Sequence, residues 1–222
     1  MADCPPNWDS RAIYVSVNGC LYLVEYCYKC GFTGPDPGNV RITYYGRLPR
    51  EQQPNPDNCS DNEVDINIIR QAVAERYLID CTIPDCSTGV AVRFIFEYPL
   101  WRIYRNRAWV DQNGEKQHFF WDESCNSGLY YCQIIRICCK TVNNGNVTYL
   151  CNTTQVAPQG NSMSCGEKPP LPPPPFTWDD NWETECVKAV SCEEIRWLRM
   201  STRGWRGLGL RIFYIFVNYL EV

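Results

Sequence analysis

Fifteen cysteines in 222 residues constrain this chain more than any other feature of its sequence. Proteins of reducing compartments seldom carry so many, whereas exported proteins use them as disulfides that hold the fold together. We therefore expect an extracellular or cell-surface protein. Because fifteen is odd, at least one thiol cannot be bridged within the chain. The disulfide candidates are Cys4, Cys20, Cys27, Cys30, Cys59, Cys81, Cys86, Cys125, Cys132, Cys138, Cys139, Cys151, Cys165, Cys186 and Cys192.

Metal binding is the alternative use of so many thiols. A structural zinc site needs two pairs of ligands, and thiol pairs commonly have CxxC spacing. Only Cys27 and Cys30 have that spacing, and His118 is the single histidine. We therefore expect disulfides, with no metal and no cofactor. Cys138 and Cys139 are adjacent, so on a strand they point to opposite faces and should have different partners.

The composition is that of a globular protein, with 45% hydrophobic and 21% charged residues. The formal charge of −4 gives no general attraction to nucleic acids or anionic membranes. The longest apolar stretch, 208–220, is too short to span a bilayer and contains Arg211. We expect neither a nucleic-acid partner nor a membrane span.

A hairpin is predicted near the N-terminus. Two β-prone runs, 11–17 and 20–28, are separated by Asn18 and Gly19, the pair that a type I′ turn favours. A two-residue turn sets the register of the strands that it joins. The expected cross-strand pairs are Val17 with Cys20, Val15 with Tyr22 and Ile13 with Val24.

One helix and several further strands are predicted. The helix follows the capping-box residues Ser60 and Glu63 and ends near Cys81, because Pro84 prevents continuation. Its apolar face comprises Ile66, Ile69, Val73 and Tyr77. Strands are expected at 40–45, 92–98, 118–121, 129–139 and 147–151, with turns at 111–114 and 143–146. The pattern favours a mainly β fold, an immunoglobulin-like or Greek-key sandwich with one inserted helix, stapled by disulfides.

Six prolines occupy the seven residues 169–175. Such a run favours an extended polyproline helix of about 3.1 Å per residue, and here a stiff strut on the order of 20 Å. We therefore expect three parts: a disulfide-rich body at 1–165, a proline-rich strut at 166–176 and a C-terminal extension at 177–222.

The extension ends in a run that is apolar on both strand faces. Such a strand must be covered on both sides, and left exposed it would promote aggregation. It is therefore a candidate for pairing with another copy of the chain. Its candidate assembly residues are Leu208, Leu210, Ile212, Tyr214 and Phe216. The alternative assembly strand is the N-terminal one, with Ile13, Val15 and Val17, although its tight turn favours pairing within the chain.

The chain shows no recognisable catalytic constellation. Nucleophilic catalysis usually needs a histidine beside the nucleophile, and His118 lies in an aromatic run that is typical of a structural strand. The adjacent acids Asp179 and Asp180, and Glu193 and Glu194, have the pattern of solvated surface charges. We expect a protein without enzymatic activity.

Two further patterns indicate possible ligands. Arginines and aromatic residues interleave between Trp101 and Trp109, as on surfaces that stack sugars or single-stranded nucleic acid. Simple alternation of strand faces produces the same composition. Asn58, Asn146 and Asn152 begin N-x-S/T sequons and are possible glycosylation sites.

Four short segments resemble cysteine-rich exported bacterial proteins of unassigned function that have an immunoglobulin-like fold. The segments are Cys4-Pro-Pro-Asn-Trp8, Val17-Asn-Gly-Cys20, Glu25-Tyr-Cys-Tyr-Lys-Cys-Gly31 and Trp182-Glu-Thr-Glu-Cys186. Some members of that group resemble subunits of pilus-like fibrils joined by donor-strand exchange. The resemblance implies no catalytic residues, and it leaves 193–222 unexplained.

The leading hypothesis is a structural subunit of an extracellular pilus-like fibre, built head-to-tail from copies of this chain by terminal β-strand exchange. A monomeric secreted carbohydrate-binding module is the alternative, with glycans as partners. A secreted hydrolase would require carboxylates that distant segments bring together.

Overall fold

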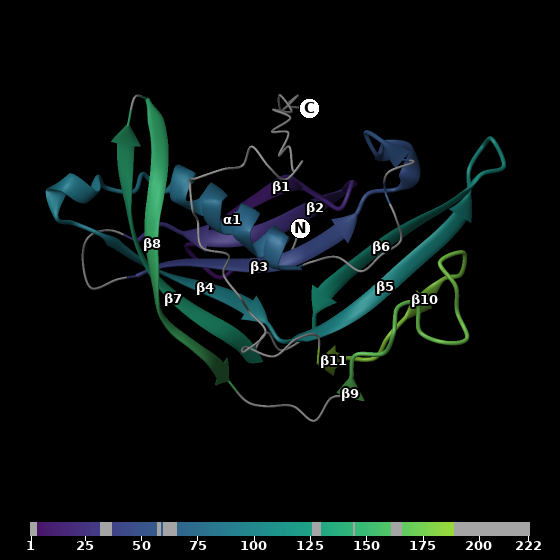
Figure 1. Cartoon of the computed structure of the whole chain (residues 1–222). Helices are drawn as coiled ribbons and strands as arrows, with labels where there is room; N and C mark the ends of the chain where they lie inside the picture. The colour runs from purple at the N-terminus through teal and green to yellow at the C-terminus, as the bar shows by residue number, and fades with distance from the viewer. Residues whose placement is uncertain are drawn as a thin grey trace.

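The computed structural model describes residues 4–31, 37–56, 59, 66–125, 130–143, 145–160 and 166–188. Within these residues the fold is mainly β with a single α-helix and several disulfides, which confirms the expected fold class (Figure 1). The elements are β1 (Asp9–Val17), β2 (Cys20–Lys29), β3 (Gly38–Arg47), η1 (Arg50–Gln52), α1 (Ile66–Asp80), η3 (Cys86–Thr88), β4 (Val92–Pro99), β5 (Trp101–Val110), β6 (Lys116–Ser124), β7 (Tyr130–Asn143), β8 (Asn146–Gly160), β9 (Gly166–Glu167), β10 (Trp182–Glu183) and β11 (Val187–Lys188).

The N-terminal hairpin forms as its turn sequence predicts. Asn18 and Gly19 have φ angles of 51° and 84°, the positive values that a type I′ turn requires. β1 and β2 are antiparallel with Val17 opposite Cys20, which confirms the expected register. Val15 and Val17 are consequently buried in the core.

The expected sandwich takes the form of one branched sheet, because β3 has two different neighbours on the same edge. One edge of β3 pairs with β2. The other pairs with β4 in parallel through 38–41 and with β6 in antiparallel through 44–47. The β2–β3 register shifts close to this switch, between Glu25 and Tyr26. Bulges bend a strand and increase its twist, so two groups of strands can diverge from β3.

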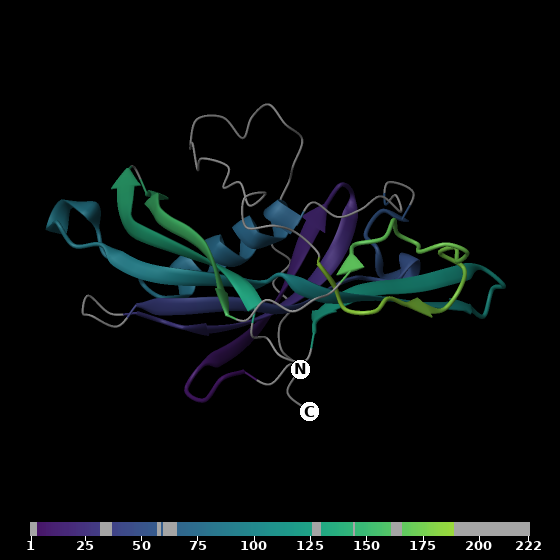
Figure 2. The same ribbon diagram turned by 90° about the horizontal axis from the view of Figure 1, so that it is seen from below.

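Two wings leave β3, and Figures 1 and 2 show them on opposite sides of the molecule. The first wing continues through β4, β7 and β8. The second continues through β6 and β5 to the short strands β10, β11 and β9. Only Leu100 separates β4 from β5, so the chain crosses directly from one wing to the other.

Helix α1 lies across one face of the central strands and covers the main core (Figure 2). Ile69, Val73 and Tyr77, on its predicted apolar face, are fully buried. The helix ends at Asp80, near the predicted position. The capping residues at 60–63 lie outside the described residues. Strand β4 contributes to the same core as the helix. Its side chains alternate as predicted, and four of them are buried there: Val92, Phe94, Phe96 and Tyr98.

The proline-rich segment differs from the straight strut that its composition predicts. The Phe176 N–H donates a hydrogen bond to the Pro173 carbonyl at 2.9 Å, which closes a turn. The Leu171–Pro172 and Pro174–Pro175 peptide bonds are cis. After the turn, β10 and β11 both pair with β5. Residues 177–188 therefore belong to the same sheet as the body.

The chain returns to β5 because it has apolar side chains to bury there. Trp182 and Val187 form a second core with Tyr104 and Phe120, and Trp178 packs against it. Trp178 meets Phe120 edge-on at 5.4 Å between ring centroids. The tail sequence thus covers one face of the β5–β6 hairpin as far as Lys188, the last described residue.

A fully buried ion pair lies where the second wing joins the central sheet. Arg102 and Asp122 are both 0% exposed and form two parallel hydrogen bonds of 2.8 and 2.7 Å. The Arg102 guanidinium also lies 5.3 Å from the Tyr45 ring centroid and 5.5 Å from that of Tyr98. Burial alone would lower the pKa of Arg102, but the surrounding Asp122, Tyr98 and Tyr45 together raise it. Both oxygens of the Asp122 carboxylate accept from the guanidinium, which is the geometry of an ionised pair.

Replacing Asp122 with Asn should lower the free energy of unfolding by about 3–5 kcal/mol, because Arg102 would remain buried without its counter-charge. Denaturant unfolding with the disulfides intact measures the change. Glu183→Gln is the matched control. Glu183 pairs with Arg105, which lies on β5 as Arg102 does, but the Glu183 side chain is 55% exposed. That variant should change stability by less than about 1 kcal/mol. Equal effects of the two variants would show that the buried pair contributes no more than a surface pair.

Candidate functional site

Six disulfides connect twelve of the described cysteines. The pairs are Cys4–Cys27, Cys20–Cys59, Cys30–Cys81, Cys86–Cys139, Cys125–Cys186 and Cys138–Cys151. Cys132 is disulfide-bonded as well. Cys165 and Cys192 lie outside the described residues. The two members of the CxxC pair have separate partners, as do the adjacent Cys138 and Cys139. Among the described residues, no cluster of three or more His, Cys, Asp or Glu could hold a metal ion.

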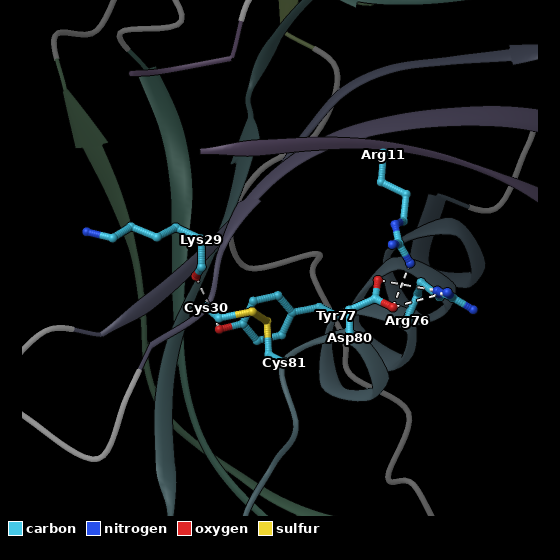
Figure 3. Close-up of a disulfide and its surroundings, with 7 residues drawn as sticks. All are labelled: Arg11, Lys29, Cys30, Arg76, Tyr77, Asp80 and Cys81. Carbon is cyan, nitrogen blue, oxygen red and sulfur yellow. Dashed lines mark hydrogen bonds and ion pairs between the residues drawn. A yellow bond between two sulfur atoms is a disulfide. The ribbon is translucent and has the colours of Figure 1, made fainter. Parts of the chain in front are cut away.

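The C-terminal end of α1 is fastened to the N-terminal hairpin (Figure 3). The Cys30–Cys81 disulfide joins the residue after β2 to the residue after the helix. Beside it, the Asp80 carboxylate lies 2.6 Å from Arg11 of β1 and 3.1 Å from Arg76 of the helix. Two arginines therefore share one carboxylate, while the disulfide supplies the covalent connection.

The hairpin of β7 and β8 is fastened in two directions. Cys138–Cys151 crosses between its two strands, and Cys86–Cys139 ties β7 to η3. The two bonds leave β7 on opposite faces because their cysteines are neighbours on a strand. The covalent links therefore hold η3, β7 and β8 together.

The outer edge of β8 is open among the described strands, because β8 pairs with β7 alone. β8 is fifteen residues long, and its sequence contains no Asp, Glu, Lys or Arg. Natural edge strands usually carry charges that prevent pairing with another chain. A Pro at 158 and a register shift near Arg136 interrupt only the second half of the pairing. The first half, 146–153, is a regular and uncharged edge.

Apolar side chains flank this edge on both faces of the hairpin. Residues that are directly paired share a face, so Val142 and Val147 lie on one face, and Leu150 and Ile137 lie on the other. All four are exposed. A strand that is added beside β8 would find apolar neighbours above and below the sheet.

The orientation of the β8 backbone follows from its two-residue turn. Asn143 and Asn146 flank the turn and form a hydrogen-bonded pair, so the next pair, Val142 with Val147, is non-hydrogen-bonded. The Cα atoms of Cys138 and Cys151, four pairs further along, are 4.2 Å apart, which is the short spacing of a non-hydrogen-bonded pair. The Val147 N–H therefore points away from β7, toward the open edge.

Of the two expected assembly strands, the structure describes only the N-terminal one. β1, with Ile13, Val15 and Val17, pairs with β2 along its full length, and Cys4–Cys27 ties the residues before it to β2. The C-terminal candidates at 208–216 lie outside the described residues. Among the sequons, Asn152 is exposed on β8, Asn146 is the first residue of β8, and Asn58 lies outside the described residues.

The structure gives little support to the sugar-stacking alternative for the run between Trp101 and Trp109. Trp101 is only 7% exposed and lies in the sheet junction, so it cannot present a ring to a ligand. Trp109 is 36% exposed and lies eight residues further along β5, about 26 Å away at the usual rise of a strand. On the same face as Trp109, Phe119 and Trp121 stack at 5.2 Å, but both are half-buried. The alternation of strand faces explains most of this composition.

A cavity of about 400 Å³ lies where β3 leaves the sheet. Its walls come from the end of β3 with the η1 loop, from the β5–β6 turn with the start of β6, and from Trp178 with Asp179. His118 lies here and stacks on Trp178 at 5.4 Å, as a structural histidine would. Asp179 forms an ion pair with Lys116, and this contact raises the pKa of Lys116. Sequence patterns could not predict this cavity, because its walls are distant in the chain.

Removing the helix fastening tests the disulfide framework. The double variant Cys30→Ser/Cys81→Ser should lose about 2–4 kcal/mol of stability. Amide exchange at the end of α1, measured by mass spectrometry, should accelerate selectively. Arg11→Gln is the control that leaves the disulfide intact. It should change stability by less than about 1 kcal/mol, because Arg76 still pairs with Asp80. Unchanged exchange in the double variant would show that packing alone holds the helix end.

No family model, curated protein or solved structure matches this chain. In the described part of the chain, no helix is both long and apolar enough to cross a membrane.

Proposed function

We propose that this protein is a non-catalytic structural subunit of an extracellular fibre, and that copies join by β-strand addition at the open edge of β8. The observation that carries the proposal is the long, uncharged edge of β8, flanked by exposed apolar side chains. In strand addition, backbone hydrogen bonds supply affinity, and side chains at alternate positions supply specificity.

The disulfides support β8 as an acceptor. An acceptor edge must keep its shape before the incoming strand arrives, and preorganisation reduces the entropic cost of binding. Cys138–Cys151 and Cys86–Cys139 fix the β7–β8 hairpin covalently. The density of disulfides in the chain also favours an oxidising, extracellular setting.

The apolar C-terminal stretch is the donor that best fits this acceptor. If 208–220 forms a strand, large apolar residues lie on both of its faces. Both faces must then be covered by other parts of a protein. Passing it to the β8 edge of the next copy makes a head-to-tail contact, which propagates into a filament. The competing donor, β1, would first have to leave β2, against its tight turn and the Cys4–Cys27 disulfide.

A monomeric carbohydrate-binding module based on the Trp101–Trp109 run has less support, because Trp101 is buried and Trp109 is far from it. This alternative predicts a compact monomer, so the experiment that tests fibre assembly also distinguishes the two.

The sharpest test is a proline at Val147. Val147→Pro removes an N–H that points to the open edge, while the β7–β8 hydrogen bonds remain. Size-exclusion chromatography and negative-stain electron microscopy should show filaments of the full chain and none of the variant. The matched control is Val147→Thr, which keeps the N–H and the β-branched shape and should still form filaments. Circular dichroism and disulfide mapping confirm that each variant is folded.

Deleting 208–222 tests the donor. The cut must fall there and not at the prolines, because residues 177–188 and Cys186 belong to the folded body. The deletion should give folded monomers. Filaments that persist without 208–222 would show that another segment is the donor. Filaments that persist in Val147→Pro would show that β8 is not the acceptor. Monomers of the full chain under all conditions would exclude the fibre function.

A further inference from the structure

The core where α1 meets the central sheet contains two buried arginines. Arg70 of α1 is 2% exposed, and Arg102 of β5 is fully buried. Both guanidiniums lie against one ring, that of Tyr98, at 4.0 and 5.5 Å from its centroid. Among the described residues, Asp122 is the only carboxylate that forms an ion pair with either arginine. Two buried cations therefore face a single buried carboxylate.

That carboxylate is already occupied. Its two oxygens accept from Nε and Nη2 of Arg102. The close neighbours of Arg70 are neutral: its Nη1 donates to Oδ1 of Asn67 at 3.2 Å, and its other close neighbour is Tyr98. Burial raises the pKa of Tyr98, so this hydroxyl stays protonated and supplies no negative charge. Within the described part of the chain, Arg70 has no counter-charge.

The two arginines also have N–H groups to spare. Nε and Nη2 of Arg70 and Nη1 of Arg102 have no hydrogen-bond partner among the described residues. A buried donor without an acceptor is destabilising, and so is a buried charge without a counter-charge. Burial lowers the pKa of Arg70, but arginine is not deprotonated in proteins. An acceptor that carried negative charge would satisfy both the donors and the charge.

The surroundings limit this acceptor to a small ion. Arg70, Arg102 and Tyr98 are all 2% exposed or less, and Tyr98 belongs to the main core. Protein cores are close-packed, so a ligand of many atoms would have to displace core side chains. A halide ion is little larger than a water molecule, and single buried waters are ordinary in protein interiors. Water, however, would leave the charge uncompensated.

We propose that Arg70 and Arg102 hold a buried chloride ion, which supplies the missing counter-charge where α1 meets β5. Guanidinium N–H groups that donate to an anion form charge-assisted hydrogen bonds, which are about twice as strong as neutral ones. The ion is structural, because it joins the helix to the strand that begins the second wing. The site does not depend on strand addition at β8, so either proposal can fail without the other.

Unfolding by urea tests the site on the full, oxidised chain, because an enclosed ion binds and leaves as the protein folds and unfolds. Sodium chloride is compared with sodium gluconate at equal sodium concentration, since gluconate is too large for the site. Above the dissociation constant, each tenfold rise in chloride should lower the equilibrium constant for unfolding about tenfold. Gluconate should have no such effect. Equal stability in the two salts at every concentration would overturn the proposal.

Bromide locates the ion directly. Crystals of the full chain grown in sodium bromide should show an anomalous scattering peak in contact with Nε and Nη2 of Arg70. Density there without an anomalous signal would identify a water molecule and would refute the proposal.

Substitutions assign the effect to Arg70. Arg70→Met is the primary variant, because methionine has a similar length and needs no counter-charge. Its stability should no longer depend on chloride. Arg76→Met is the matched control: Arg76 lies on the same helix, but its side chain is 28% exposed and pairs with Asp80. This control should keep the full chloride dependence. Chloride dependence that survives Arg70→Met would place the ion elsewhere, and if that variant does not fold, the bromide peak decides.

Discussion

The Arg102–Asp122 pair is the interaction on which the branched sheet depends. Two wings can leave one strand only if their junction is filled, and here the junction contains charge as well as apolar groups. The pair is fully buried, bidentate and bounded by the rings of Tyr45 and Tyr98. The Arg70 guanidinium of α1 lies 4.0 Å from the centroid of the same Tyr98 ring. A buried pair of this kind adds little net stability over an apolar core, but it strongly penalises arrangements that separate its members. It therefore specifies how β5, β6 and the helix meet.

Much of the local structure could be predicted because it depends on neighbouring residues. The Asn18–Gly19 turn determined the register of the first hairpin, and the spacing from Ile69 to Tyr77 identified the helix and its buried face. The branching at β3 could not be predicted, because pairing with both β4 and β6 depends on contacts across many tens of residues. The path of the proline-rich segment could not be predicted for a similar reason. Its composition favours an extended helix, but burial of Trp182 beside Phe120 turns the chain back onto β5.

The features of the candidate sites also differ in whether they depend on neighbouring residues or on distant contacts. Cysteine content predicted a disulfide framework, whereas the individual pairs depend on which strands become neighbours. Alternation could not distinguish Trp101 from Trp109, because both occupy the same face of β5 and only the position of the junction buries the first. The sequence could not identify β8 as an edge strand, because that depends on the order of the strands in the sheet. The cavity has walls from three distant segments, so no sequence pattern could indicate it.

The connectivity of the disulfides also determines how this protein would carry a mechanical load. Consider tension applied between Cys4 and Cys186. The force can pass through Cys4–Cys27, Cys30–Cys81, Cys86–Cys139 and Cys125–Cys186 in turn. Between these bonds it needs only three backbone stretches, 27–30, 81–86 and 125–139. Everything else between the two ends is bypassed by covalent bonds and cannot lengthen, even if the sheet loses its hydrogen bonds. The protein would behave as a short, nearly inextensible link whose length is limited by its disulfides and not by the stability of its fold.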